Sequence, residues 1–220
     1  MPKRQSVEPS SRRAVQPSSQ ILDAAERLFA ERGFRAATIQ ELGKASGLSP
    51  ALIYYYYRDK AGLYEAVIGR LIESMVGAAL SRAPAEVDPA VALRAIVEVQ
   101  GEMFLARPHV ARLIARELVD YEGQHAQKAV RETLTRLFQR LTGLIAAGQK
   151  TGRFRADLTP SFAAVSVVAQ VAWFAVASPV VGTLLGDGPK GPSGKKKQAF
   201  VRHAADFALS ALDHDRGESA

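Results

Sequence analysis

Helix start and stop signals recur along the whole chain, and they constrain its fold more than any other feature. The segment TIQE, residues 38–41, has the capping-box pattern, in which a Thr hydroxyl and a Glu carboxylate satisfy free backbone N–H groups. Ser49-Pro50 and Asp88-Pro89 each combine an N-cap side chain with a proline in the first turn, where no N–H is missed. No segment alternates apolar and polar residues as a half-buried strand does. The sequence therefore predicts an all-α fold.

Apolar residues at spacings of three and four fill the intervals between these signals. Together they predict helices over 19–33, 38–46, 50–57, 60–82, 89–105, 108–121, 124–150 and 160–177, and a last helix after residue 197. The segment 186–197, GDGPKGPSGKKK, is predicted to be a flexible connector because glycine and proline break regular structure. The alternative of a phosphate-binding glycine loop fails because no strand precedes it.

A chain of 220 residues with 47% hydrophobic and 23% charged side chains suits a small domain joined to a larger one. We expect a disordered basic arm over residues 1–17, a small helical domain over 18–64 and a larger helical domain over 65–214. The arm has four basic side chains and one acidic one, so it either reaches a polyanion such as DNA or only aids solubility. It has no apolar core of the kind found in a secretory signal, so we expect a cytoplasmic protein.

Residues 161–185 carry no formal charge, and their number is sufficient to span a bilayer. Pro179 and Gly182 interrupt the stretch, so the unbroken helix is predicted to end near Ala177. A buried or interface helix fits this pattern better than a membrane span, and no membrane partner is expected.

The sequence offers little for catalysis. There is no cysteine, which excludes disulfides, thiol catalysis and cysteine-based metal sites. The four histidines are dispersed without metal-ligand spacing, and we interpret them as surface residues. We therefore predict no enzyme activity, no catalytic residue, no metal site and no cofactor.

Two short capped helices joined by Gly47-Leu48-Ser49 have the form of a helix-turn-helix, whose second helix enters the major groove of DNA. At 100° per residue, Ile53 and Tyr57 lie on one face of the second helix, and Tyr54 and Tyr55 on the opposite one. Exposed tyrosines can donate to a phosphate or touch a base edge. The alternative is that all four consecutive tyrosines, residues 54–57, are core residues, but so short a helix cannot bury every side.

The segment 21–68 closely resembles the TetR family of bacterial transcriptional regulators. The likeness rests on 48 contiguous residues, ILDAAERLFAERGFRAATIQELGKASGLSPALIYYYYRDKAGLYEAVI. Beyond residue 68 it is a likeness of architecture, a variable helical C-terminal domain. The resemblance implies an N-terminal three-helix DNA-binding domain and a larger C-terminal domain for ligand binding and dimerisation.

The resemblance also implies roles for single residues. Thr38, Tyr54 and Lys60 would contact phosphates, although for Lys60 a solvated side chain is the alternative. Base edges or the adjacent backbone would be contacted by Ser49, Pro50, Ala51 and Tyr55. Many relatives have lysine and glycine where this chain has Pro50 and Ala51, so a polar contact is lost. Base specificity would then depend more on contacts to thymine methyl groups and on DNA shape.

For the C-terminal domain, the resemblance implies a homodimer formed through the last two long helices and an effector pocket among the earlier ones. The helical repeats of small and apolar residues in 162–176 and 200–211 suit such an interface, and an ordinary core is the alternative. The same alternative applies to the pocket candidates, which are Met103, Phe104, Leu113, Phe138, Leu141 and Trp173.

These observations predict a homodimeric repressor that is released from a palindromic double-stranded operator by a small apolar or amphipathic ligand. An activator or a ligand-independent regulator remains the alternative within the DNA-binding class. The alternative from another class is an all-helical ligand-binding or interaction protein whose head reads no operator, which Pro50 motivates.

Overall fold

The computed structural model describes residues 16–84 and 87–213, and their regular structure is helical apart from one isolated β-bridge between Phe154 and Asp213. The predicted all-α class is confirmed. Most of the predicted basic arm, residues 1–15, lies outside the described residues. Pro17, which was assigned to that arm, already begins the first helix.

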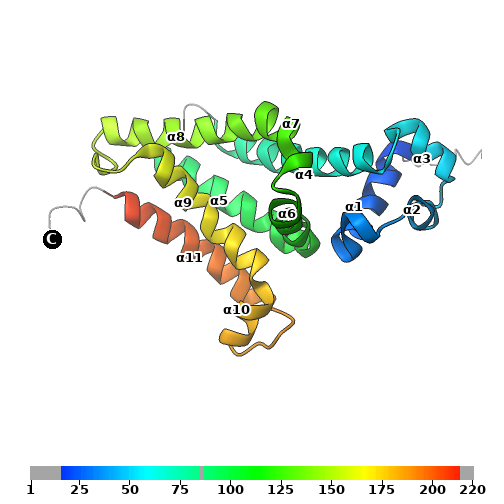
Figure 1. Cartoon of the computed structure of the whole chain (residues 1–220). Coiled ribbons are helices and arrows are strands. Elements are labelled where there is room, and N and C mark those ends of the chain that lie inside the picture. The colour runs from blue at the N-terminus through cyan, green and yellow to red at the C-terminus, as the bar shows by residue number, and fades with distance from the viewer. Residues whose placement is uncertain (1–15, 85–86, 214–220) are drawn as a thin grey trace, which may run out of the picture.

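Three helices form a head at one end of the molecule (Figure 1): α1 (Pro17–Ala36), α2 (Ile39–Ser46) and α3 (Pro50–Tyr57). Gly33 interrupts the first helix at the position where the sequence predicted its end. Gly33 adopts a φ of 78°, which glycine tolerates without a Cβ penalty, and one further turn follows this kink. The kink redirects the chain toward Ala37, whose N–H donates to the Gly33 carbonyl.

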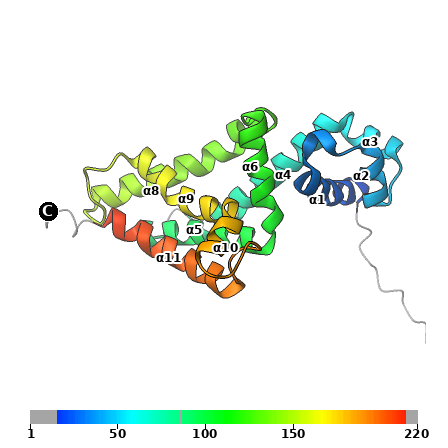
Figure 2. The same cartoon turned by 60° about the horizontal axis from the view of Figure 1, so that its bottom comes forward.

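The long helix α4 (Lys60–Arg82) leads from the head into the body (Figures 1 and 2). The Asp59 carboxylate caps its start by accepting from the Gly62 N–H at 2.8 Å. The body contains α5 (Pro89–Ala106), α6 (Pro108–Tyr121), α7 (Gln127–Ala129), α8 (Thr135–Lys150), α9 (Pro160–Val176), α10 (Ser178–Leu184) and α11 (Gly194–Leu212).

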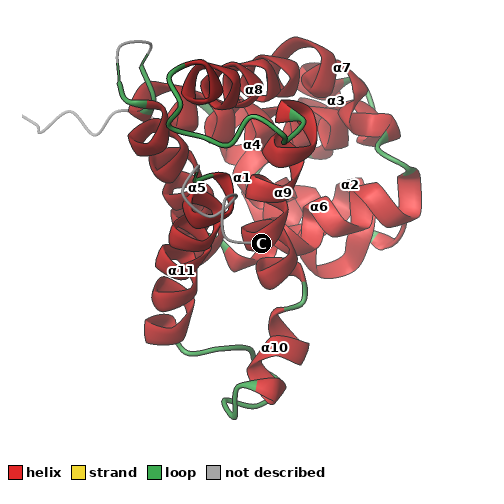
Figure 3. Cartoon of the chain, turned by 90° about the vertical axis from the view of Figure 1, so that its left-hand side faces the viewer, coloured by secondary structure: helices red, strands yellow, loops and turns green. Residues whose placement is uncertain are grey.

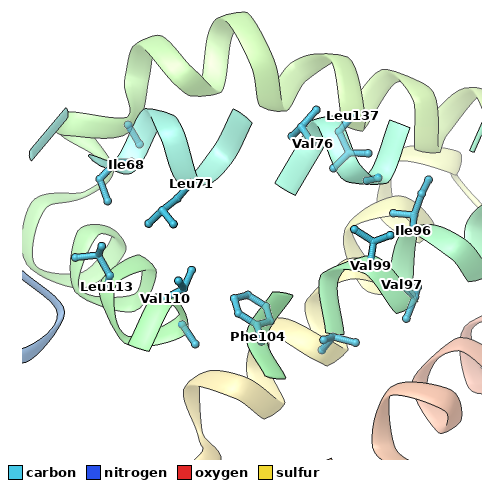
Figure 4. Close-up of a cluster of buried hydrophobic side chains, with 14 of the residues drawn as sticks. Ile68, Leu71, Val76, Ile96, Val97, Val99, Phe104, Val110, Leu113 and Leu137 are labelled. Atoms are coloured by element: carbon cyan, nitrogen blue, oxygen red, sulfur yellow. The ribbon is translucent and has the colours of Figure 1, made fainter. Parts of the chain in front are cut away.

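The centre of the body is α5, which packs against α4, α6, α8, α9 and α11. Figure 4 shows apolar side chains from several of these helices pointing toward one another, among them Leu71 of α4, Phe104 of α5, Val110 of α6 and Leu137 of α8. This shared core extends to both ends of α4 and fixes the head relative to the body. A displacement of α4 therefore cannot stay local, because close-packed interiors transmit strain.

Two predicted boundaries were wrong, and one helix was not predicted. The segment 124–150 is not one helix, because a 3₁₀ turn (Gln124–Ala126), α7 and a π-helical segment (Val130–Leu134) precede α8. A further helix, α10, follows the predicted end at Ala177, since Pro179 lies in its first turn, where proline is tolerated. The predicted connector ends early, because the Ser193 hydroxyl accepts from the Lys196 N–H and starts α11 at Gly194.

Figure 3 shows α10 apart from the main stack of helices, between two loops. Among the described helices, none alone is both long and apolar enough to cross a membrane. The pair α9 and α10 meets those criteria together by length and composition, but the two are bent by 79°.

Candidate nucleic-acid interface and ligand cavity

The turn between α2 and α3 is fixed by short-range contacts. Gly47 ends α2 with a φ of 70°, and the Leu48 N–H donates to the Gly43 carbonyl at 3.2 Å. The Ser49 hydroxyl then caps α3 by accepting from the Leu52 N–H. A Cβ on Gly43 would lie 3.0 Å from the Leu48 carbonyl, so this glycine lets the two helices approach closely. The predicted helix-turn-helix is present in the structure.

The capping box predicted at the start of α2 forms. The Thr38 hydroxyl accepts from the Glu41 N–H at 3.2 Å, and the Glu41 carboxylate accepts from the Thr38 N–H at 3.1 Å. Hydrogen bonds from Thr38 lower the pKa of Glu41, and Arg32 lies 2.6 Å from the same carboxylate. Thr38 itself is exposed, so its hydroxyl is held at the surface beside the free N–H groups of the helix start.

The tyrosine run is divided by its helix, α3, into an outward and an inward part. Ile53 is buried and Tyr57 is half-buried, whereas Tyr54 is 51% and Tyr55 81% exposed. The orientation predicted from the helical period is therefore confirmed. Tyr56 is 41% exposed and meets the Tyr55 ring edge-on at 5.3 Å between centroids. Ser49, Pro50 and Ala51 are also exposed, at the first turn of the same helix.

Tyr57 attaches α3 to α1. Its hydroxyl donates to the Ser18 carbonyl at 2.9 Å, and burial raises its pKa. Because this bond joins residues 39 apart in the sequence, it holds α3 on α1. Tyr57 thus serves the structure of the head and leaves its neighbours to face solvent.

Lys60 has a role that sequence reasoning missed. Its Nζ donates to the carbonyls of Arg35 and Ala37 at 3.2 and 3.0 Å and lies 4.7 Å from the centre of the Phe34 ring. The ammonium thus satisfies carbonyls at the C-terminal end of α1, where a positive charge is favourable. A phosphate contact by Lys60 stays a prediction, and it would use the third N–H of the ammonium group.

Arg58 is an exposed cation beside α3 that was not among the predicted contacts. Its side chain is 90% exposed, and its backbone has a φ of 61°, which is uncommon outside glycine. Extending the helical period by one residue past Tyr57 places Arg58 on the same side as Tyr54, and that signal could have identified it. Its guanidinium lies 3.3 Å from the Asp59 carboxylate, whose pKa is lowered chiefly by the Gly62 N–H.

The head is joined to the body through a buried carboxylate on α1. Glu26 is 4% exposed, and its two oxygens lie 3.0 Å from Arg70 Nη2 of α4 and 2.7 Å from His109 Nε2 of α6. Arg107, at the start of α6, lies 3.5 Å away. A buried carboxylate of this kind depends on its partners, because a lone buried charge is costly. These pairs oppose any separation of α1 from α4 and α6.

A second contact between head and body is aromatic. The rings of Phe34, Tyr64 and Tyr121 meet around His125, whose Nδ1 lies 3.1 Å from the buried Glu117 carboxylate. Burial, followed by the charge of Glu117, raises the pKa of Tyr64. The expectation of surface histidines was wrong for His109 and His125, because each pairs with a buried carboxylate. His203 is exposed, and His214 lies outside the described residues.

The six predicted pocket residues do not surround one cavity. Phe138 and Leu141 line an apolar cavity of about 210 Å³ between α4, α5, α8 and α9, together with Met75 and Ala79 of α4. Phe104 lines a smaller cavity beside α9 and α11, Leu113 is buried in the core, and Met103 packs against that core. Trp173 is 70% exposed. The sequence patterns identified these residues as apolar, but they do not distinguish a residue that lines a cavity from one that is packed in the core.

The helices α9 and α11 expose large apolar side chains along a common side of the body. Phe162 and Trp173 of α9 are 75% and 70% exposed, and Phe207 of α11 is 57% exposed. The two helices also pack against each other, and the rings of Phe174 and Phe200 are stacked with their centroids 3.8 Å apart. The exposed side, called here the α9–α11 face, consists of Phe162, Val165, Trp173, Val176 and Phe207.

Among the described residues, no group of three or more acidic or histidine side chains is arranged to hold a metal ion.

Two sequence families match the chain. The family described as "Bacterial regulatory proteins, tetR family" matches residues 21–67, the segment that contains α1, α2 and α3. The family described as "Tetracyclin repressor-like, C-terminal domain" matches residues 89–205, which is more than half of the chain.

Individual proteins extend this similarity. The chain is 25% identical to the HTH-type transcriptional repressor KstR2 of Rhodococcus jostii (strain RHA1) over 158 residues, 72% of this chain and 77% of that protein. In fold it is similar to the fatty acid degradation regulator FadR from Bacillus halodurans, with a TM-score of 0.72, 19% identity and coverage of 91% and 98% of the two chains. A transcriptional regulator FadR from Bacillus subtilis, solved in complex with stearoyl-CoA, gives a TM-score of 0.67 at 14% identity, covering 88% and 98%.

Proposed function

This chain belongs to the TetR family of bacterial regulatory proteins, and on that premise we propose that it is a homodimeric repressor that releases a palindromic operator when a small effector binds. Its task is DNA-binding transcriptional regulation. We place this activity in the cytoplasm, where the DNA is, and assign no catalytic step to the chain.

The outward side of α3 is the observation that carries the proposal. Tyr54 and Tyr55 are exposed on a short helix that is held rigidly by its own cap and by Tyr57. Rings with hydroxyl groups can pack on a sugar or a thymine methyl and donate to a phosphate. Ser49, Pro50 and Ala51 bring the same helix close to base edges, and Thr38 and Arg58 lie exposed beside it for phosphate contacts.

One such helix makes few contacts, so specific binding calls for two copies. We propose that the α9–α11 face joins two chains into a four-helix interface, because a monomer would leave Phe162, Trp173 and Phe207 in water. A two-fold axis through this face would set the two α3 helices one or more DNA turns apart and match a palindromic site.

The effector would act through α4, which contributes to both sites. Its first turns hold α1 through Lys60 and Arg70, and its last turns provide Met75 and Ala79 to the 210 Å³ cavity. These two ends are about 28 Å apart along the helix. A ligand that shifts the cavity wall would shift the head, and couplings of this kind are typically about 1–3 kcal/mol. The stearoyl-CoA complex of the Bacillus subtilis regulator supports ligand binding by this fold.

A mobility-shift experiment tests the proposal. The full chain is titrated onto a palindromic fragment from its own promoter region and onto a scrambled fragment of equal length, at two salt concentrations. Selective retardation of the palindrome is expected. Retention of both fragments that vanishes with salt would instead support the alternative, a helical ligand-binding protein whose head reads no operator. Transcription assays with the same fragment separate a repressor from an activator.

A further inference from the structure

The residues that line the apolar cavity limit the chemistry of the ligand that it can bind. Its wall is formed by Met75 and Ala79 of α4, Ile96 of α5, Leu137 and Leu141 of α8 and Val168 of α9, with Leu134, Phe138 and Gln100 completing it. None of the described residues in this wall carries a charge. Burying a charged group there would lack any compensation, so the wall favours a neutral molecule.

One polar atom at this apolar wall has no hydrogen-bond partner among the described residues. Gln100 of α5 lines the cavity, and its Oε1 is buried with no hydrogen bond from the part of the chain that the structure describes. Buried polar groups are normally paired, so an unpaired one needs an explanation. A hydroxyl group on a ligand would be the missing partner, because it can donate to the amide oxygen of Gln100. With the amide in the flipped orientation, the same hydroxyl can accept from the amide nitrogen.

The volume limits the size of the ligand. An apolar protein cavity of about 150 Å³ takes up benzene, which corresponds to about 25 Å³ per heavy atom. On that scale, 210 Å³ holds about eight heavy atoms. A single substituted ring or a medium alkyl chain fits, whereas a large multi-ring ligand requires the wall to open.

The wall has a segment suited to such adjustment. Leu134 belongs to the π-helical segment Val130–Leu134, and π-helical turns are rare and occur frequently at functional sites. The Thr135 hydroxyl donates to the Val130 carbonyl at 2.9 Å and so satisfies a backbone group of this wide turn. Phe138, one turn further along α8, is 39% exposed at the same cavity.

We infer that this cavity is the effector site of the proposed repressor and that it takes a neutral amphiphile of about eight heavy atoms, with a hydroxyl group that bonds Gln100 and an apolar body against α4 and α8. The inference rests on the proposed function only in calling the ligand an effector. Binding itself is measured without DNA.

Calorimetric titration of the full-length chain with three probes tests the ligand class. p-Cresol and p-xylene have the same shape and eight heavy atoms, but only p-cresol has a hydroxyl group, while benzoate is similar in size and charged. We expect p-cresol to bind about tenfold more tightly than p-xylene, the worth of one net hydrogen bond. Benzoate should bind more weakly still. Equal binding of p-cresol and p-xylene, preference for benzoate, or binding of none of the three would overturn the inference.

Two variants locate the bound molecule. Gln100→Leu should lower p-cresol affinity about tenfold and abolish its advantage over p-xylene. Gln139→Leu, the same change at an exposed position on α8 outside the cavity wall, should change neither. Ala79→Leu adds three carbons inside the cavity and should weaken both ligands. If Gln100→Leu does not fold, the comparison of probes on the unchanged chain and on Ala79→Leu still decides the matter.

A DNA arm separates this inference from the proposed function. p-Cresol is added to the complex of the chain with its palindromic fragment, and the released fraction is measured. Binding without release keeps the ligand class and refutes its role as an effector. Selective DNA binding in a chain that binds no probe keeps the repressor and refutes the ligand class.

Discussion

Tyr55 and Tyr57 lie two residues apart on α3, and replacing each in turn should separate DNA binding from stability. Tyr55 is 81% exposed, so Tyr55→Ala removes little packing and should change the free energy of unfolding by less than about 0.5 kcal/mol. Tyr57→Phe removes the hydroxyl that donates to Ser18 and should cost about 1 kcal/mol. In a chain of this length that corresponds to a fall of about 2–4 °C in the melting temperature.

For DNA affinity, we expect Tyr55→Ala to have the larger effect and Tyr57→Phe the smaller one. One contact from Tyr55 to a phosphate or a base edge contributes about 1 kcal/mol. Because the proposed dimer uses two copies of α3, Tyr55→Ala removes the contact twice, for a total of about 2 kcal/mol. That loss raises the dissociation constant of the operator complex about 30-fold. Tyr57→Phe leaves the outward side of α3 intact and should bind within a few-fold of the unchanged chain.

Fluorescence anisotropy with a labelled palindromic fragment at fixed salt measures the affinity, and thermal unfolding measures stability. Tyr55→Phe serves as the control that separates the hydroxyl from the ring. An unchanged dissociation constant for Tyr55→Ala would refute the assignment of α3 as the reading helix. A larger loss of melting temperature for Tyr55→Ala than for Tyr57→Phe would refute the division of the tyrosine run into an outward and an inward part.

Three further changes test other parts of the molecule. Thr38→Ala breaks the capping box of α2 and should lower the free energy of unfolding by about 1 kcal/mol, measured by thermal unfolding. Thr38→Ser keeps the capping hydroxyl and should retain most of that stability. The raised pKa of Tyr64 predicts a contribution to the free energy of unfolding that is complete below its ordinary value of 10.0. This contribution is lost as pH rises from that value through the higher folded pKa, because the unfolded chain ionises first. In Tyr64→Phe the free energy of unfolding should therefore fall less steeply with pH above about 10. Phe207→Glu places a charge on the α9–α11 face and should yield monomers in sedimentation and weaker operator binding, while a dimer of unchanged stability would place the interface elsewhere.

Structural features that depend on residues close together in the chain were predicted correctly from the sequence. Thr38 and Ser49 cap the helices that they were predicted to cap, because each bonds an N–H only three residues away. The orientation of Tyr54 and Tyr55 follows from the helical period alone. The resemblance over residues 21–68 added the function to this geometry, and the family matches support it.

Sequence reasoning failed where the partner is distant along the chain. His109 was interpreted as a surface residue, yet it pairs with Glu26, 83 residues away. For Lys60, the sequence did not predict the hydrogen bonds to carbonyls at the end of α1, 23 and 25 residues before it. Of the six predicted pocket residues, Phe138 and Leu141 share the 210 Å³ cavity, whereas Trp173 is exposed. Apolar spacing identifies a buried side of a helix but does not say which helix, ligand or second chain covers it.

The amino-acid sequence by itself determined the helices, their caps and the outward side of α3, because each depends on groups within about one turn of one another. Tertiary structure alone decided how the head is joined to the body and which apolar residues enclose a cavity. It also decided that Gln100 Oε1 faces this cavity with no hydrogen bond from the described residues. Those features arise from packing between segments that are far apart in the chain, and no local pattern of residues specifies which segments meet.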